Sequence, residues 1–133
     1  MGIPSGVDGY VLKGLAGRGD DHYAPDSDDL IKILAESGLV LKYEQPAESR
    51  DRLLLKSADW WGPILLFTQQ ALAGGAGNVL ANAVWEMVGR TNPRRQLHIE
   101  VGSERTPEHE VTWFKGHGPA EDVLKALRTW RGD

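Results

Sequence analysis

The order of apolar and polar side chains divides this chain into a central region and two charged flanks. Residues 60–85 carry no charged side chain, whereas charges are frequent before and after them. Further along, residues 96–102 and 109–115 alternate between apolar and polar positions, which is typical of strands with one buried face. The flanks therefore follow ordinary patterns, and the central region is the part that needs an interpretation of its own.

The two alternating stretches predict a β-hairpin, because the polar segment between them is short enough for a direct connection. If Ile99 is paired with Val111, then Leu97 is paired with Trp113. All four side chains would then face one core, and the intervening residues would face outward.

One helix is predicted on each side of the central region. After Asp26, Leu30 and Leu34 recur at helical spacing, and Gly38 ends the helix. The second helix begins at residues 118–119, because proline suits the first turn and acidic residues follow it. Its apolar face consists of Val123, Leu124, Leu127 and Trp130.

The remaining segments complete the predicted fold. Residues 39–43 and 52–56 are β-prone and are separated by a polar loop, which predicts two further strands. Residues 1–25 are rich in glycine and predict a flexible arm, in which residues 9–13 are the candidate for a short strand. Residues 26–133 would then form a single α+β domain. Its sheet would be mainly antiparallel, with two strands and the C-terminal hairpin packed against a long central helix and flanking helices.

We interpret the charge-free region as that long central helix. Pro63 suits a first helical turn, and the small residues 74–77 would let another backbone approach closely. A helix that is apolar on nearly all sides needs more cover than one sheet supplies, which indicates a protein partner or a homo-oligomer. The residues predicted to form this interface are Trp60, Trp61, Leu72, Gly74, Gly75, Gly77 and Trp85.

Two other interpretations of this region compete with a buried helix. The region is long enough to cross or insert into a membrane, with tryptophans near both ends, although glutamine and asparagine interrupt it. A nucleotide site would use residues 74–78 as a phosphate-binding loop before a helix. However, Leu80 occupies the third glycine position of the dinucleotide fingerprint, and no lysine follows the glycines.

Composition narrows the possible functions. The chain has no cysteine, which excludes disulfides and thiolate metal sites and agrees with a cytoplasmic location. The net charge of −4 implies no basic face, so we expect no nucleic-acid partner. The four histidines do not pair at metal-ligand spacing, and we expect neither a metal nor a cofactor. The N-terminus does not have the pattern of a secretion signal.

The candidate catalytic residues lie on the predicted hairpin. His98 and Glu100 would share its outer face with Glu110, and a histidine beside two carboxylates suits acid–base chemistry. Outer strand faces are commonly polar without being catalytic, so the sequence favours a protein that is not an enzyme.

In residues 71–130, a helix of small residues is followed by an aromatic and basic segment, then by the alternating hairpin and a terminal helix. This order resembles that of the small actinobacterial proteins called effector-associated constant component 1. The resemblance implies a non-catalytic adaptor in a multi-component conflict system, and it assigns no catalytic residues.

We therefore expect a non-enzymatic interaction or adaptor protein, acting in a bacterial defence or conflict system and using its central helix for assembly or partner binding. The alternatives are a membrane-associated protein that uses residues 60–85, and a small enzyme or nucleotide-binding domain.

Overall fold

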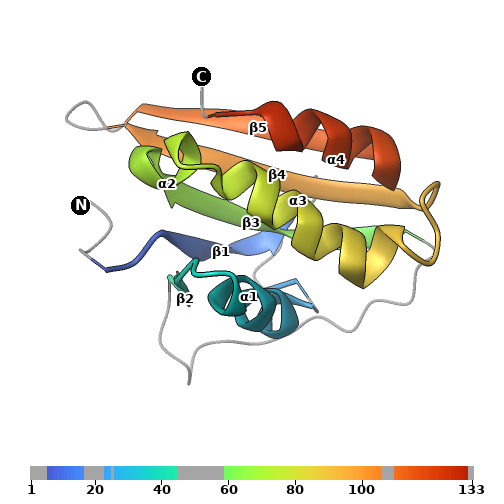
Figure 1. Cartoon of the computed structure of the whole chain (residues 1–133), viewed down its shortest axis with the longest axis horizontal. Coiled ribbons are helices and arrows are strands. Elements are labelled where there is room, and N and C mark those ends of the chain that lie inside the picture. The colour runs from blue at the N-terminus through green and yellow to red at the C-terminus, as the bar shows by residue number, and fades with distance from the viewer. Residues whose placement is uncertain (1–5, 17–22, 25, 45–58, 106–109, 132–133) are drawn as a thin grey trace.

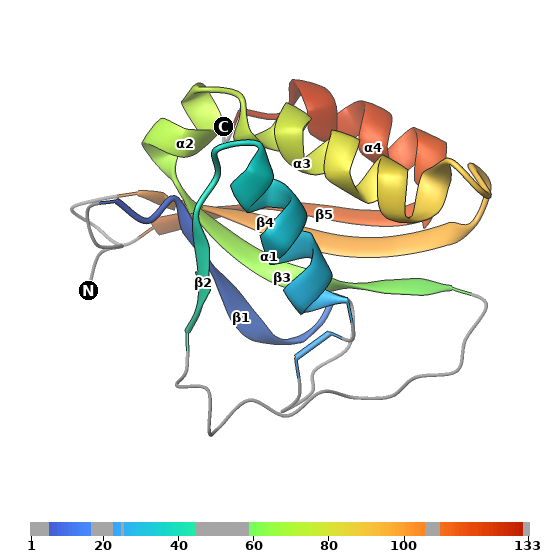
Figure 2. The same ribbon diagram turned by 60° about the horizontal axis from the view of Figure 1, so that its bottom comes forward.

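The computed structural model describes residues 6–16, 23–24, 26–44, 59–105 and 110–131. Within them the chain forms a five-stranded sheet with its helices on one face (Figures 1 and 2).

The sheet is mixed, with the strand order β2-β1-β3-β4-β5. The β1–β2 and β3–β4 pairings are parallel, and the β1–β3 and β4–β5 pairings are antiparallel. The prediction of a mainly antiparallel sheet is therefore wrong, because the central region adds a strand that runs parallel to its neighbour β4. The strands are β1 (Gly9–Leu15), β2 (Leu41–Tyr43), β3 (Trp60–Thr68), β4 (Gln96–Arg105) and β5 (Glu110–Pro119).

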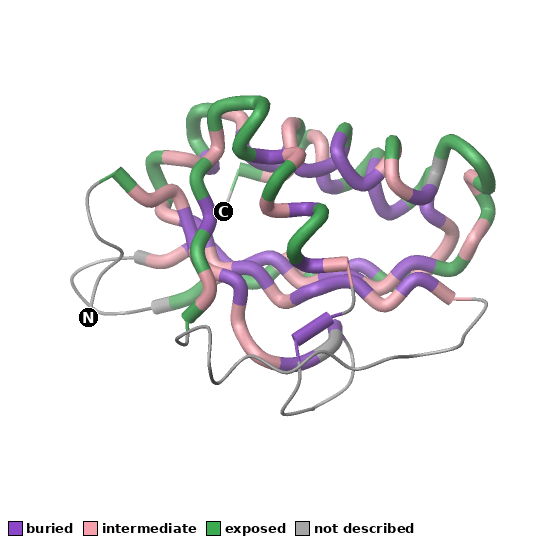
Figure 3. The backbone as a smooth tube through the Cα atoms, turned by 90° about the horizontal axis from the view of Figure 1, so that it is seen from below, coloured by how far each residue is buried: buried purple, intermediate pink, exposed green. Residues whose placement is uncertain are grey.

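The helices form a single layer over the sheet (Figures 2 and 3). The predicted first and last helices are confirmed as α1 and α4. Acidic residues occupy the first turn of both, where they complement the helix dipole. The helical segments are α1 (Ser27–Glu36), α2 (Gln69–Ala73), α3 (Ala76–Val84), the π-helical turn η2 (Trp85–Gly89) and α4 (Ala120–Thr129).

The charge-free region is not one long helix, contrary to the prediction. Its first part is β3, the middle strand of the sheet, and its remainder forms α2, α3 and the start of η2. A continuous apolar run fits a strand covered on both faces as well as it fits a buried helix. Here Leu65 and Phe67 are fully buried under the helices, while Ile64 and Leu66 are half-buried on the other face.

Pro63 lies in a strand rather than in a first helical turn. The β3–β4 register shifts between Trp61 and Ile64, so the proline sits at an irregularity where the loss of one backbone donor is tolerated. A Cβ atom on the preceding Gly62 would lie 2.6 Å from the carbonyl oxygen of His98. The strands approach so closely at this point that only glycine fits.

The core lies between the sheet and the helix layer (Figure 3). Leucines from α1, α3 and α4 meet the inward-facing residues of β3 and β4, which explains the strictly alternating burial along β4 from Leu97 to Val101. The largest fully buried side chains are Tyr23, Leu30, Leu34, Leu65, Phe67, Leu72, Leu80, Leu97, Ile99, Leu124 and Leu127.

The predicted hairpin is confirmed, but its register differs from the prediction. Ile99 is paired with Gly116 instead of Val111, and Leu97 is paired with Gly118 instead of Trp113. A Cβ atom on Gly116 would lie 2.5 Å from Cγ1 of Val123, so α4 packs directly on this glycine. Gly116 therefore lies under α4 at the position where Val111 was expected to face the core, and both Val111 and Trp113 lie on the outer face of β5.

The N-terminal half differs from the prediction in its connections. The short strand for which residues 9–13 were the candidate is confirmed as β1 (Gly9–Leu15), and it lies between β2 and β3. The strand predicted at residues 39–43 is present as β2, but it pairs in parallel with β1. The strand predicted at residues 52–56 lies outside the described residues.

The small residues of α3 pack against α4. A Cβ atom on Gly77 would lie 2.8 Å from the carbonyl oxygen of Leu127 and 2.9 Å from that of Trp130. The close backbone approach expected from the sequence thus occurs within the chain. No helix of the described residues is long and apolar enough to cross a membrane.

We expect Gly77→Ala to destabilise the fold by about 1–3 kcal/mol, because the added methyl group would clash with two backbone carbonyls that cannot move independently of α4. Chemical denaturation would measure the loss. Gly74→Ala is the matched control, because its nearest neighbour would be 3.4 Å away and its backbone conformation suits alanine. Equal losses in the two variants would contradict this account of α3–α4 packing.

Candidate functional site

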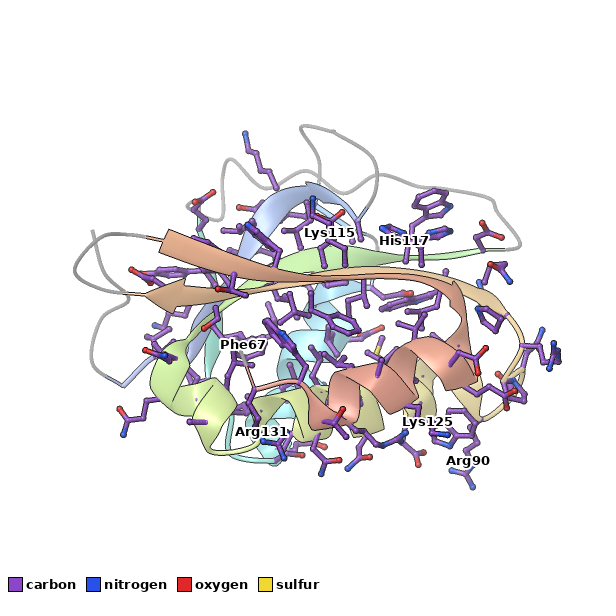
Figure 4. The ribbon with its side chains drawn as sticks, turned by 90° about the horizontal axis from the view of Figure 1, so that it is seen from above. Phe67, Arg90, Lys115, His117, Lys125 and Arg131 are labelled. Atoms are coloured by element: carbon purple, nitrogen blue, oxygen red, sulfur yellow. The ribbon has the colours of Figure 1, made fainter. Side chains whose placement is uncertain are left out.

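The sheet face turned away from the helices carries a polar cluster near one end. His98 lies on β4 and is paired with His117 on β5 and with Trp61 on β3. Asp59 lies just before β3. His117 and Lys115 point away from the helix layer in Figure 4, whereas Phe67 points into it. We call Asp59, Trp61, His98 and His117 the histidine cluster.

Hydrogen bonds connect three members of the histidine cluster in a chain. Nε2 of His98 lies 3.0 Å from Oδ2 of Asp59, and Nδ1 of His98 lies 2.9 Å from Nδ1 of His117. The Trp61 indole stacks on the His98 ring, with 4.0 Å between ring centroids and 14° between the planes. These contacts hold His98 on both nitrogens and one face, and only 15% of its side chain is exposed.

When both rings are neutral, the chain of contacts selects one arrangement of protons. A carboxylate only accepts hydrogen bonds, so His98 carries its proton on Nε2 and donates it to Asp59. Nδ1 of neutral His98 is then an acceptor, and His117 must donate from its own Nδ1. This leaves Nε2 of the exposed His117 as an unprotonated nitrogen, for which no described residue is a hydrogen-bond partner.

The predicted catalytic residues fall at opposite ends of the hairpin. His98 and Glu100 lie on the outer face as alternate residues of β4, where Lys115 is paired with Glu100. Glu110 is paired with Arg105 at the other end, so it is not brought to His98. The sequence prediction missed Asp59 and His117. The pairing of His98 with His117 would have followed from the hairpin only if its register had been known.

The described residues contain no group of three or more histidine, aspartate or glutamate side chains that could hold a metal ion.

The predicted interface residues are distributed over several environments. Leu72 is fully buried, and Gly77 is covered by α4. Gly74 and Gly75 lie between α2 and α3, where Gly75 has a left-handed φ of 103°. Trp61 belongs to the histidine cluster, and Trp85 is partly exposed at the start of η2. Trp60 is almost completely buried and reaches a groove in the helix layer.

This groove runs between α1 on one side and α3 with η2 on the other. It consists of two hollows of about 430 and 200 Å³, which share Ile33 as a wall. We call it the α1–α3 groove. Its apolar lining consists of Ile33, Trp60, Val79, Ala83 and Met87.

The position of Trp60 in this groove is fixed by a hydrogen bond. Its indole Nε1 donates to Oδ2 of Asp26 at 2.7 Å, which ties the start of β3 to the start of α1. The charged residues that line the groove are mainly acidic. They are Asp26, Asp29, Glu36 and Glu86, against Lys32 and Arg95.

Comparison of this chain with protein-family models, curated proteins and solved structures gives no match.

When both rings are neutral, NMR of the ring nitrogens should show the proton of His98 on Nε2 and the proton of His117 on Nδ1. Asp59→Ala removes the acceptor that selects this order, so both rings should relax to tautomer mixtures. Asp122→Ala, which removes a carboxylate from α4 in the helix layer, is the control and should change neither ring. Wild-type rings that share the same tautomer would contradict the proton arrangement.

Proposed function

We propose that this chain is a non-enzymatic interaction protein that binds an apolar, basic helical segment of a partner protein in the α1–α3 groove. The observation that carries the proposal is the groove itself, in which apolar side chains of α1, α3 and η2 lie between charged residues that are mainly acidic. Grooves of this kind accept an amphipathic helix, whose apolar side enters while its polar side stays in water.

The lining of the groove supports a protein ligand. Ile33 and Val79 face each other across it and are only partly buried, although both touch the core. A partner that covers them would remove apolar surface from water without moving the core, because Trp60 is already fixed by Asp26. Preorganised walls reduce the entropy that binding costs.

The border of the groove supports a basic partner. Four of its six charged residues are acidic, and two of these, Asp29 and Glu36, are on α1. Acidic side chains around an apolar channel favour lysine or arginine on the rim of the bound segment, and they speed its association.

Under this proposal, one side of α3 packs within the chain and the other side contacts the partner. The side with Gly77 packs on α4 inside the chain, and the side with Val79 and Ala83 lines the groove. Partner binding by the central region is therefore retained from the sequence interpretation, but it moves from the small-residue patch to the opposite side of α3. The resemblance to effector-associated constant component 1 proteins remains a prediction, and it would place this binding within a bacterial defence or conflict system.

Selection of peptides from a random phage-displayed library on the immobilised protein tests the proposal. We expect enriched peptides with apolar residues at helical spacing and several lysines or arginines. Val79→Lys should weaken a selected peptide about tenfold or more, since it places a repelling charge in the apolar channel. Gln70→Lys adds the same charge on exposed α2, outside the groove, and should leave the affinity unchanged.

Peptides that bind Val79→Lys and the wild type equally would contradict the groove as the binding site. Amide chemical-shift changes on adding the peptide give an independent measurement, and they should map to α1, α3 and η2. Changes confined to the sheet would also contradict the proposal.

Reversing a border charge should have a smaller effect that depends on salt. We expect Glu36→Lys to weaken a basic peptide by roughly threefold at low ionic strength, and to have little effect at high salt, because the Debye length shortens. Titrations at two salt concentrations measure this difference. A loss of affinity that is independent of salt would mean that Glu36 acts through the shape of the groove rather than through its charge.

A further inference from the structure

Strand β5 forms a long free edge of the sheet. It has ten residues and, among the strands that the structure describes, is paired only with β4. Within the described part of the chain, no other element donates or accepts a backbone hydrogen bond along residues 111–118. Figure 4 looks onto this edge, with β5 and α4 nearest to the viewer. Natural proteins usually shorten, cover or pair such an edge, because its unpaired backbone groups bind other strands.

The side chains on the outer face of β5 change character along the strand. Val111 and Trp113 are apolar and 36% and 38% exposed, whereas Lys115 and His117 are polar and exposed. The Trp113 ring reaches over β4, since a Cβ atom on Gly102 would be 3.0 Å from its Cζ3. The rest of the indole surface is partly exposed and can contact a neighbour.

The inner face of the same strand carries a second exposed aromatic group. Phe114 contacts Trp130 at the end of α4, with 5.8 Å between ring centroids, and both side chains are only partly buried. Aromatic pairs of this size contribute strongly to interfaces when water is removed from them.

We propose that two copies of this chain associate by antiparallel pairing of their β5 edges about a two-fold axis at Phe114. Such pairing sets residue 113 of one copy opposite residue 115 of the other. The two-fold axis then creates two equivalent contacts between Trp113 of one copy and Lys115 of the other. In each contact the lysine ammonium group is attracted to the face of the indole ring. Pairing one residue further along would instead set the two lysines against each other.

The same axis brings the two inner aromatic groups together. Phe114 would lie opposite the partner's Phe114, with Trp130 beside each ring, so both faces of the extended sheet gain complementary contacts. Closed two-fold pairing is self-limiting, because each copy has one long edge and β2 at the other edge has only three residues. This surface is separate from the α1–α3 groove and goes beyond the proposed function.

Sedimentation of the purified chain tests the proposal. The wild type should be a dimer, and Trp113→Lys should raise the dissociation constant about tenfold or more, since lysines of the two copies then face each other twice. Adding Lys115→Glu to this variant sets each new lysine opposite the partner's glutamate and should restore the dimer. Lys125→Glu on exposed α4 makes the same charge change as Lys115→Glu, but away from the β5 edge. It should have no effect on the dimer.

A wild-type chain that is monomeric at submillimolar concentration overturns the proposal, even if foreign strands bind the edge. So does a dimer that Trp113→Lys leaves intact, or one that the double variant fails to restore. Far-ultraviolet circular dichroism shows whether each variant is folded. Amide hydrogen exchange adds a measurement that needs no substitution, because protection along β5 should increase with protein concentration. Peptide binding in the groove should be the same in the wild type and in Trp113→Lys, so the two proposals fail separately.

Discussion

The fold depends on covering the inner face of β3. This strand is the middle of the sheet, hydrogen bonded to β1 on one side and to β4 on the other, and it contains no charged residue. Its inner face supplies Leu65 and Phe67 to the core, and the chain then turns directly into α2 and α3, which cover that face. The close fit of α3 on α4 at Gly77 follows, because both helices must share the area above β3, β4 and β5.

Features set by neighbouring residues could be predicted from the sequence, and features set by distant partners could not. The ends and faces of α1 and α4 follow from acidic first turns and apolar spacing, and the hairpin follows from alternation. The run from Ile64 to Phe67 suits a helix and a buried strand alike. The choice is made by β1 and β4, which lie far from it in the sequence. The hairpin register places Gly116 directly under α4, and this close packing is visible only once α4 is placed over the sheet.

The candidate sites show the same division. Alternation alone puts His98 and Glu100 on one face of the sheet, but the partners of His98 come from two other strand ends. Asp59 reaches His98 because β3 and β4 run in parallel, and His117 does so because of the hairpin register. The groove depends on the packing of α1 against α3 and η2. Helix α1 precedes the charge-free region in the sequence, whereas α3 and η2 lie at the end of that region. A dimer joined at β5 would carry two such grooves, so a partner with two binding segments would be held more tightly than one with a single segment.

The strand order also has a consequence for synthesis of the chain. Strand β1 emerges first; β2 then pairs with it on one side and β3 on the other, β4 adds beside β3, and β5 adds beside β4. Each new strand therefore has a neighbour that the ribosome has already released, and none of the five described strands must enter between two that are already paired. Since chains fold in part while they are being made, this sheet can grow outward in the order of translation. Its last strand to appear is the long edge that remains open.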